Sequence, residues 1–140
     1  MAILALLAAG CARPVAVDPP APDADAAQVC AGFVAALPEE LVVGARRDVE
    51  PPSRLTAAYG DPPVAIRCGV PEPGALRGTA TLVTVEGIDW LAEELTRGWL
   101  MTTVGRVAGI EIIVPDEQGP APSVAADLAP AIRAAVPAAA

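Results

Sequence analysis

Few residue types in this sequence could carry out chemistry. Histidine and lysine are absent, and all nine basic residues are arginines. Catalysis by Ser–His or Cys–His arrangements, or by a lysine nucleophile, is therefore excluded. The phosphate-binding patterns G-x-G-x-x-G and G-x-x-x-x-G-K are absent as well. The side chains that remain as candidates for a site are carboxylates, arginines and three cysteines.

Two carboxylates, Asp61 and Asp89, are the candidates for acid–base chemistry. A pair of carboxyl groups about 5–9 Å apart can act as acid and base, but sequence spacing does not bring these two together. A structural role is the preferred interpretation. Asp61 would form a turn before Pro62, and Asp89 would lie on the solvent face of a strand. No catalytic residue is assigned, and a non-catalytic protein is favoured.

Arg67 and Arg106 each lie in an otherwise apolar run that is typical of a strand. A guanidinium in such a place needs a carboxylate partner. The first hypothesis is an internal ion pair, with Asp61 or Asp89 as the partner. The alternative is a site in which these arginines bind a carboxylate- or phosphate-bearing ligand bidentately.

Charge and composition argue against several classes of partner. The net charge is −8, and no run of basic residues occurs, so nucleic-acid binding is not expected. Two lone cysteines without histidine do not make a four-ligand zinc site. Neither a metal nor a cofactor is therefore expected. Anionic headgroups repel an acidic surface, so contact with a membrane would require an anchor.

The N-terminus predicts such an anchor. Residues 2–9 are wholly apolar but too short to span a bilayer, which takes about 20 residues. They suit the apolar region of a signal peptide. The run L-L-A-A-G-C resembles a bacterial lipobox, which implies cleavage after Gly10 and a diacylglycerol on Cys11. A plain secretory signal and an apolar segment packed in the fold are the alternatives. Because the usual charged region is missing, the true start is expected to lie upstream.

Assigning Cys11 to lipid leaves Cys30 and Cys68 as a pair. A disulfide between them would stabilise a small domain by about 4 kcal/mol in the chain-entropy model. Such a bond agrees with an extracytoplasmic location, on the outer face of the cell membrane or in the secreted fraction. Two buried free thiols are the alternative.

The chain divides into a signal peptide (1–10), a Pro/Asp-rich tether (11–25), one domain (26–136) and a frayed tail (137–140). Periodicity and turn signals predict the elements of that domain. The first half of the domain is predicted to contain a helix capped by Asp25 and ended by Pro38, an extended run at 41–49, a short helix at 53–59 and a strand at 64–68. The second half is predicted to contain a hairpin of 79–85 and 88–95 and two strands at 99–107 and 109–115. A last helix is capped by Ser123 and carries an apolar stripe of Val124, Leu128, Ile132 and Val136.

Consecutive strands joined by short turns must pair antiparallel. The predicted fold is therefore a small two-layer α+β domain, in which N- and C-terminal helices pack on one face of an antiparallel sheet and one disulfide links the layers.

Several segments together resemble an actinobacterial family known as domain of unknown function family 3515. Y-G-D-P-P-V-A-I-R-C-G-V-P (59–71) carries most of the resemblance, supported by V-E-G-I-D-W-L (85–91), T-T-V-G-R (102–106) and I-E-I-I-V-P (110–115). The similarity covers roughly residues 27–135. Tyr59 stands where tryptophan is usual, and Glu86 where asparagine is common. The resemblance implies an exported or lipid-anchored domain from a high-GC Gram-positive organism, and no activity.

The leading functional hypothesis is a non-catalytic binding or scaffolding lipoprotein of the cell envelope. It would be held to the membrane through Cys11 and would contact other envelope proteins. One alternative is a small envelope hydrolase that uses Asp and Glu only. The other is a carrier of a small anionic ligand through Arg67 and Arg106.

Overall fold

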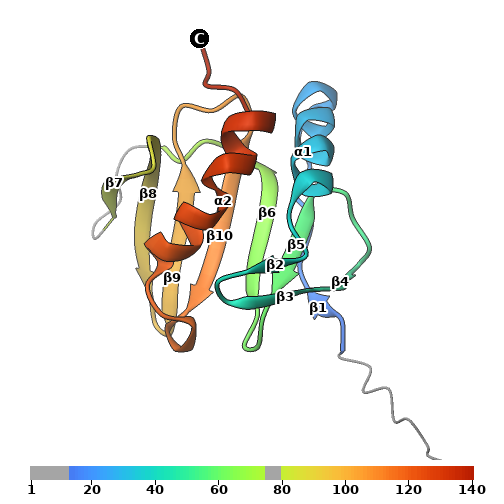
Figure 1. Cartoon of the computed structure of the whole chain (residues 1–140). Coiled ribbons are helices and arrows are strands. Elements are labelled where there is room, and N and C mark those ends of the chain that lie inside the picture. The colour runs from blue at the N-terminus through green and yellow to red at the C-terminus, as the bar shows by residue number, and fades with distance from the viewer. Residues whose placement is uncertain (1–12, 75–79) are drawn as a thin grey trace, which may run out of the picture.

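The computed structural model describes residues 13–74 and 80–140. The predicted signal peptide and Cys11 lie outside the described residues. In the described part of the chain, two α-helices and one short 3-10 helix accompany a large antiparallel sheet (Figure 1). The helices are α1 (Ala24–Ala36), η1 (Asp116–Gln118) and α2 (Ala121–Ala135).

Ten strands are found in the same described residues. Eight of them form one antiparallel sheet in the order β2-β3-β5-β6-β10-β9-β8-β7, and the short β1 and β4 pair in parallel. Their bounds are β1 Val15–Ala16, β2 Glu40–Leu41, β3 Gly44–Arg47, β4 Val49–Glu50, β5 Thr56–Tyr59, β6 Val64–Val70, β7 Thr81–Val85, β8 Ile88–Leu95, β9 Gly98–Thr103 and β10 Gly109–Pro115.

Period-two alternation determines which side chains of the sheet enter the core. Along β6 every second residue is buried, beginning at Val64, as expected for a strand with two different faces. The face that carries Ile66, Ile112 and Trp90 contributes to a single buried cluster, which also contains residues of both helices. We call this the core face of the sheet and the opposite one the open face.

The helices follow from local signals and an apolar stripe. Asp23 caps α1, and its side chain accepts a hydrogen bond from the backbone N–H of Ala26. The cap lies two residues before the Asp25 expected from the sequence. Helix α2 begins at Ala121 rather than after Ser123, since Pro120 and Pro122 already suit a first turn. Its predicted stripe is confirmed, because Val124, Leu128, Ile132 and Val136 are all fully buried.

The disulfide between Cys30 and Cys68 is present and joins α1 to β6. The two Cα atoms are 5.4 Å apart, a distance common for disulfides. Both cysteines are fully buried within the core cluster. The predicted link between a helix and a strand is therefore confirmed.

Part of the segment predicted to be a tether contacts the open face of the sheet. Val15 and Val17 are buried against Ala58 of β5, and β1 pairs with β4. Pro22 lies so close to Gly69 that a Cβ there would approach the Pro22 ring to 2.7 Å. Burial of these apolar side chains outweighs the freedom of a solvated spacer.

The short helix predicted at 53–59 is also wrong. Residues 56–59 form β5, between β3 and β6. All four side chains of β5 are buried, because the core covers one face and the N-terminal segment covers Ala58 on the other. The Ser53 hydroxyl accepts a hydrogen bond from the Leu55 N–H and so stabilises a turn rather than a helix cap.

The tail predicted to fray at 137–140 pairs with the β9–β10 loop. Ala138 forms a bridge with Arg106. Backbone hydrogen bonds run from Val107 N–H to Pro137 and from Ala139 N–H to Gly105. These backbone hydrogen bonds tie down the tail, whereas a frayed end would form its hydrogen bonds with water.

Candidate functional site

A row of four side chains crosses the open face of the sheet. The strand register places Arg67 of β6 opposite Glu111 of β10, Glu111 opposite Thr102 of β9, and Thr102 opposite Leu91 of β8. Directly opposed residues on neighbouring strands lie within contact distance. The sheet therefore aligns an arginine, a carboxylate, a hydroxyl and an apolar side chain.

Arg67 forms an ion pair within this row. Its Nη1 donates to Oε1 of Glu111 at 2.8 Å, and its Nε donates to the carbonyl of Asp18 at 2.9 Å. The two side chains are 29% and 15% exposed. The predicted partners of Arg67, Asp61 and Asp89, are thus corrected to Glu111. The pairing of β6 with β10 brings Glu111 opposite Arg67. The strand register cannot be read from a single sequence, so this partner could not be predicted.

Asp61 and Asp89 lie elsewhere and do not converge. Asp61 is on the β5–β6 turn, its side chain is 92% exposed, and it approaches Arg47 only to 4.0 Å. Asp89 is at the β7–β8 end of the sheet, where its carboxylate accepts a hydrogen bond from the Thr84 hydroxyl at 2.6 Å. Both positions agree with the structural roles expected from the sequence.

Arg106 is in the loop between β9 and β10, not within a strand as its apolar neighbours predicted. The preceding Gly105 has φ = 74°, a left-handed conformation that favours glycine. Nη1 of Arg106 donates to the carbonyl of Val136 at 3.1 Å. Within the described residues, Arg106 has no carboxylate oxygen closer than 4.0 Å. Its remaining guanidinium donors are thus available to another group.

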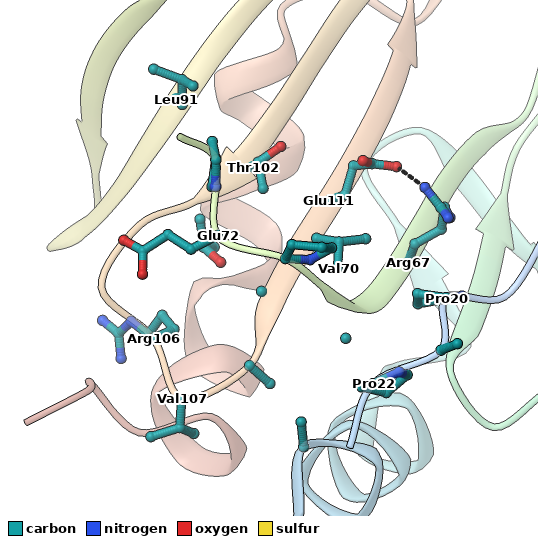
Figure 2. A pocket seen from close by; sticks show the side chains of 18 of the residues that line it. Pro20, Pro22, Arg67, Val70, Glu72, Leu91, Thr102, Arg106, Val107 and Glu111 are labelled. Carbon is teal, nitrogen blue, oxygen red and sulfur yellow. Dashed lines mark hydrogen bonds and ion pairs between the residues drawn. The ribbon is translucent and has the colours of Figure 1, made fainter. Parts of the chain in front are cut away.

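Arg67 and Arg106 line the same groove on the open face, with a volume of about 830 Å³ (Figure 2). Strands β6, β8, β9 and β10 contribute to its floor. One wall is the N-terminal segment around Pro20 and Pro22, and the other is formed by residues 71–74 and the β9–β10 loop. Both polar and aliphatic side chains line the groove, a mixture common in small-molecule sites.

Six further polar residues line the groove, none of which was assigned to a site from the sequence: Asp23, Glu72, Glu93, Thr102, Thr103 and Glu111. Oε1 of Glu72 accepts a hydrogen bond from the Gly105 N–H at 3.2 Å. The position of Glu111 inside the I-E-I-I-V-P strand was the available signal, because a carboxylate in an apolar strand needs a partner. No comparable signal marks Glu72, which lies in a proline-rich connection.

The described residues show neither a metal cluster nor a membrane-spanning helix. Among residues 13–74 and 80–140, no three potential ligands of the His, Cys, Asp and Glu types gather closely enough to hold a metal ion. In the same residues, no helix combines the length and hydropathy needed to cross a bilayer.

Comparison with known proteins finds one match. Residues 1–140 match a protein-family model described as "Protein of unknown function (DUF3515)". No curated protein and no solved structure matches the chain.

Proposed function

The chain belongs to the DUF3515 family of proteins of unknown function, and we propose that it is an exported, lipid-anchored binding module without catalytic activity. Its ligand would bind in the groove on the open face, with an anionic group held by Arg106. This proposal unites the binding-module hypothesis with that of an anion carrier.

The observation that carries the proposal is the position of Arg106. Arg106 lines a groove of about 830 Å³, and the one hydrogen bond of its guanidinium in the described structure goes to a backbone carbonyl. A guanidinium with unused donors at the wall of a cavity is well suited to bind carboxylate or phosphate. Arg67 also lines the groove but is engaged by Glu111, so Arg106 is the more available cation.

Neither helix contributes to the groove apart from the first turn of α1, so the open face over β6, β10, β9 and β8 can serve this role. The buried residues of α1 and α2 share one cluster with the core face, which supports placing both helices on that side. The groove volume falls within the usual range of about 300–1,000 Å³ for small-molecule sites. Its aliphatic lining, which includes Val70, Leu91 and Val107, would contact an apolar part of the ligand.

The hydrolase hypothesis receives less support. Asp61 and Asp89, the carboxylates considered for catalysis, do not line the groove. Four carboxylates do line it: Asp23, Glu72, Glu93 and Glu111. Asp23 accepts a hydrogen bond from the Ala26 N–H at the start of α1, Glu72 accepts one from the Gly105 N–H, and Glu111 is paired with Arg67. Two catalytic carboxylates must both be free to exchange protons with a substrate, and three of these four are engaged in contacts within the protein.

The proposed extracytoplasmic location rests on the cysteines. A buried disulfide is characteristic of proteins that fold in oxidising compartments. The lipobox-like run that ends at Cys11 would supply the membrane anchor. With an acidic chain of net charge −8, electrostatic attraction to anionic lipid is not available as a substitute.

The binding hypothesis can be tested by NMR titration of the ¹⁵N-labelled chain from residue 11 onward, with Cys11→Ser to prevent thiol reactions. Acetate and inorganic phosphate serve as separate probes. We expect at least one to cause saturable shifts of the Arg106 Nε–H and Gly105 amide signals. In Arg106→Gln, which lacks the Nε–H, we expect the shift of the Gly105 amide to be abolished. Arg97→Gln removes the same charge at an exposed residue away from the groove and should bind as the unsubstituted chain does. Equal responses in the two variants would refute the proposal.

A further inference from the structure

Glu72 places a carboxylate beside the candidate anion site. It follows β6 and lies between Pro71 and Pro73, whose rings restrict the local backbone. The exposed Glu72 side chain accepts the 3.2 Å hydrogen bond from the Gly105 N–H, across 33 residues of sequence. Figure 2 shows Glu72 and Arg106 at the same end of the groove.

The loop that donates this hydrogen bond is held firmly from behind. The carbonyl of Gly105 accepts from Ala139 N–H at 2.8 Å, and Arg106 is bonded through Nη1 to the end of α2 at Val136. The Gly105 N–H and the remaining Arg106 donors therefore lie on a supported loop. Together they form a two-point site of the kind that binds one carboxylate.

We propose that the Glu72 carboxylate occupies the Gly105 N–H half of this site in the free protein, and that the ligand carries a carboxylate on an apolar body, displaces Glu72 and also engages Arg106. The inference rests on the proposed function and specifies its ligand class. A carboxylate is favoured over other anions because the Gly105 N–H already binds one. The apolar body is suited to the aliphatic residues that line the groove, Val70 and Val107 among them.

Displacement should be easy, because the internal contact is long and exposed to solvent. A hydrogen bond to a charged group at 3.2 Å in water contributes little. While Glu72 occupies the Gly105 N–H, the ligand can bind only to those molecules in which the site is free. The apparent affinity is therefore the intrinsic affinity multiplied by that free fraction. Removing its charge also removes repulsion between Glu72 and an incoming anion. We therefore expect Glu72→Gln to tighten carboxylate binding about fivefold, a modest change on the affinity scale.

The test uses N-acetyl-leucine as the probe and N-acetyl-leucinamide, which lacks the carboxylate, as its matched control. Affinities are measured by NMR titration of the chain from residue 11 onward with Cys11→Ser. Glu72→Gln is compared with Glu94→Gln, the same charge change at an exposed residue outside the groove. We expect tighter N-acetyl-leucine binding in Glu72→Gln only, loss of binding in Arg106→Gln, and no binding of the amide.

The remaining outcomes separate this inference from the proposed function. If Arg106→Gln abolishes binding but Glu72→Gln binds no more tightly than Glu94→Gln, the displacement of Glu72 is refuted and the anion site stands. If inorganic phosphate binds and N-acetyl-leucine does not, the carboxylate class is refuted. If neither anion binds to any variant, Glu72→Gln included, the inference and the proposed function fail together.

Discussion

Tyr59 combines full burial with an ionisable hydroxyl. Its side chain has no exposed surface, and its Oη donates a 2.6 Å hydrogen bond to the carbonyl of Pro38. Burial raises the pKa of Tyr59 above its ordinary value of 10.0; the positive charge of Arg46 lowers it and the negative charge of Glu39 raises it, both to a smaller extent. The folded protein therefore favours the neutral phenol.

This pKa shift predicts a loss of stability in alkali. The contribution of Tyr59 is fully present below pH 10, where the phenol of the unfolded chain is neutral as well. It is lost as the pH rises from the unfolded pKa through the higher folded pKa, because the unfolded chain ionises first. In that window the free energy of unfolding should fall by about 1.4 kcal/mol per pH unit. Chemical denaturation between pH 9 and pH 12 measures the slope.

The chain offers a clean control for this measurement. It contains one tyrosine and no lysine, so few other side chains titrate in that range. Both proteins carry Cys11→Ser. At neutral pH, the free energy of unfolding of Tyr59→Phe should be about 1 kcal/mol lower than that of the parent, because the hydrogen bond is missing. Above pH 10, the free energy of unfolding of the parent should fall, whereas that of Tyr59→Phe should stay constant. A slope that persists unchanged in Tyr59→Phe would rule out Tyr59 as its source.

At the residue scale, the sequence singled out two arginines that line the groove, but it did not predict their partners. Arg67 and Arg106 were identified because a charge in an apolar run needs an explanation, and both line the groove. The partner of Arg67 could not be deduced, because Glu111 lies 44 residues further along the chain and reaches Arg67 only through strand register. Glu72 was not identified, because its contact depends on how two loops fold back on each other.

At the scale of elements, strong local signals gave correct predictions. The hairpin around Glu86-Gly87 forms as expected, with positive φ at both turn residues and Val85 paired to Ile88. The prediction failed at β5, where Thr56–Tyr59 lies between two strands despite its alanines. Tertiary burial outweighs weak helix propensity in so short a segment.

The disulfide between α1 and β6 yields a prediction for these elements. It closes a sequence separation of 38 residues, so replacing both cysteines in Cys30→Ala/Cys68→Ala should lower the free energy of unfolding by about 4 kcal/mol. Denaturation of this variant can be compared with Cys11→Ser, which leaves the bond intact. Because α1 also packs on α2 and β6, we expect a folded but weaker domain. A loss well under 1 kcal/mol would show that packing alone fixes α1.

On the scale of the whole molecule, the sequence predicted an antiparallel sheet with two helices but not its strand order. The neighbours β6 and β10 are joined by no short turn, so no local pattern reports their pairing. The packing of Val15 and Val17 on the open face was missed for a related reason. Proline-rich composition favours an extended chain, and an extended chain can lie on a sheet as well as in solvent.

The proposed membrane anchor is a property of the whole chain and is tested in cells that produce it. We expect mass spectrometry of the mature protein to find a diacylglycerol thioether on Cys11 and the protein in the membrane fraction. Cys11→Ser should lose the lipid, whereas Ala12→Ser, the same new side chain one residue later, should keep it. An unmodified Met1 on a cytosolic species would contradict both the anchor and the export hypothesis.

The pairing of the tail with the β9–β10 loop has a practical consequence for protein engineering. Pro137 and Ala139 hold the backbone on either side of Arg106, and Val136 holds its guanidinium. Trimming the chain after Val136 would keep that buried core residue but remove both backbone contacts of Pro137 and Ala139. It should therefore loosen the loop around Arg106 and weaken anion binding without unfolding the core. Purification tags and fluorescent fusions placed at that end need a spacer that leaves these backbone contacts intact.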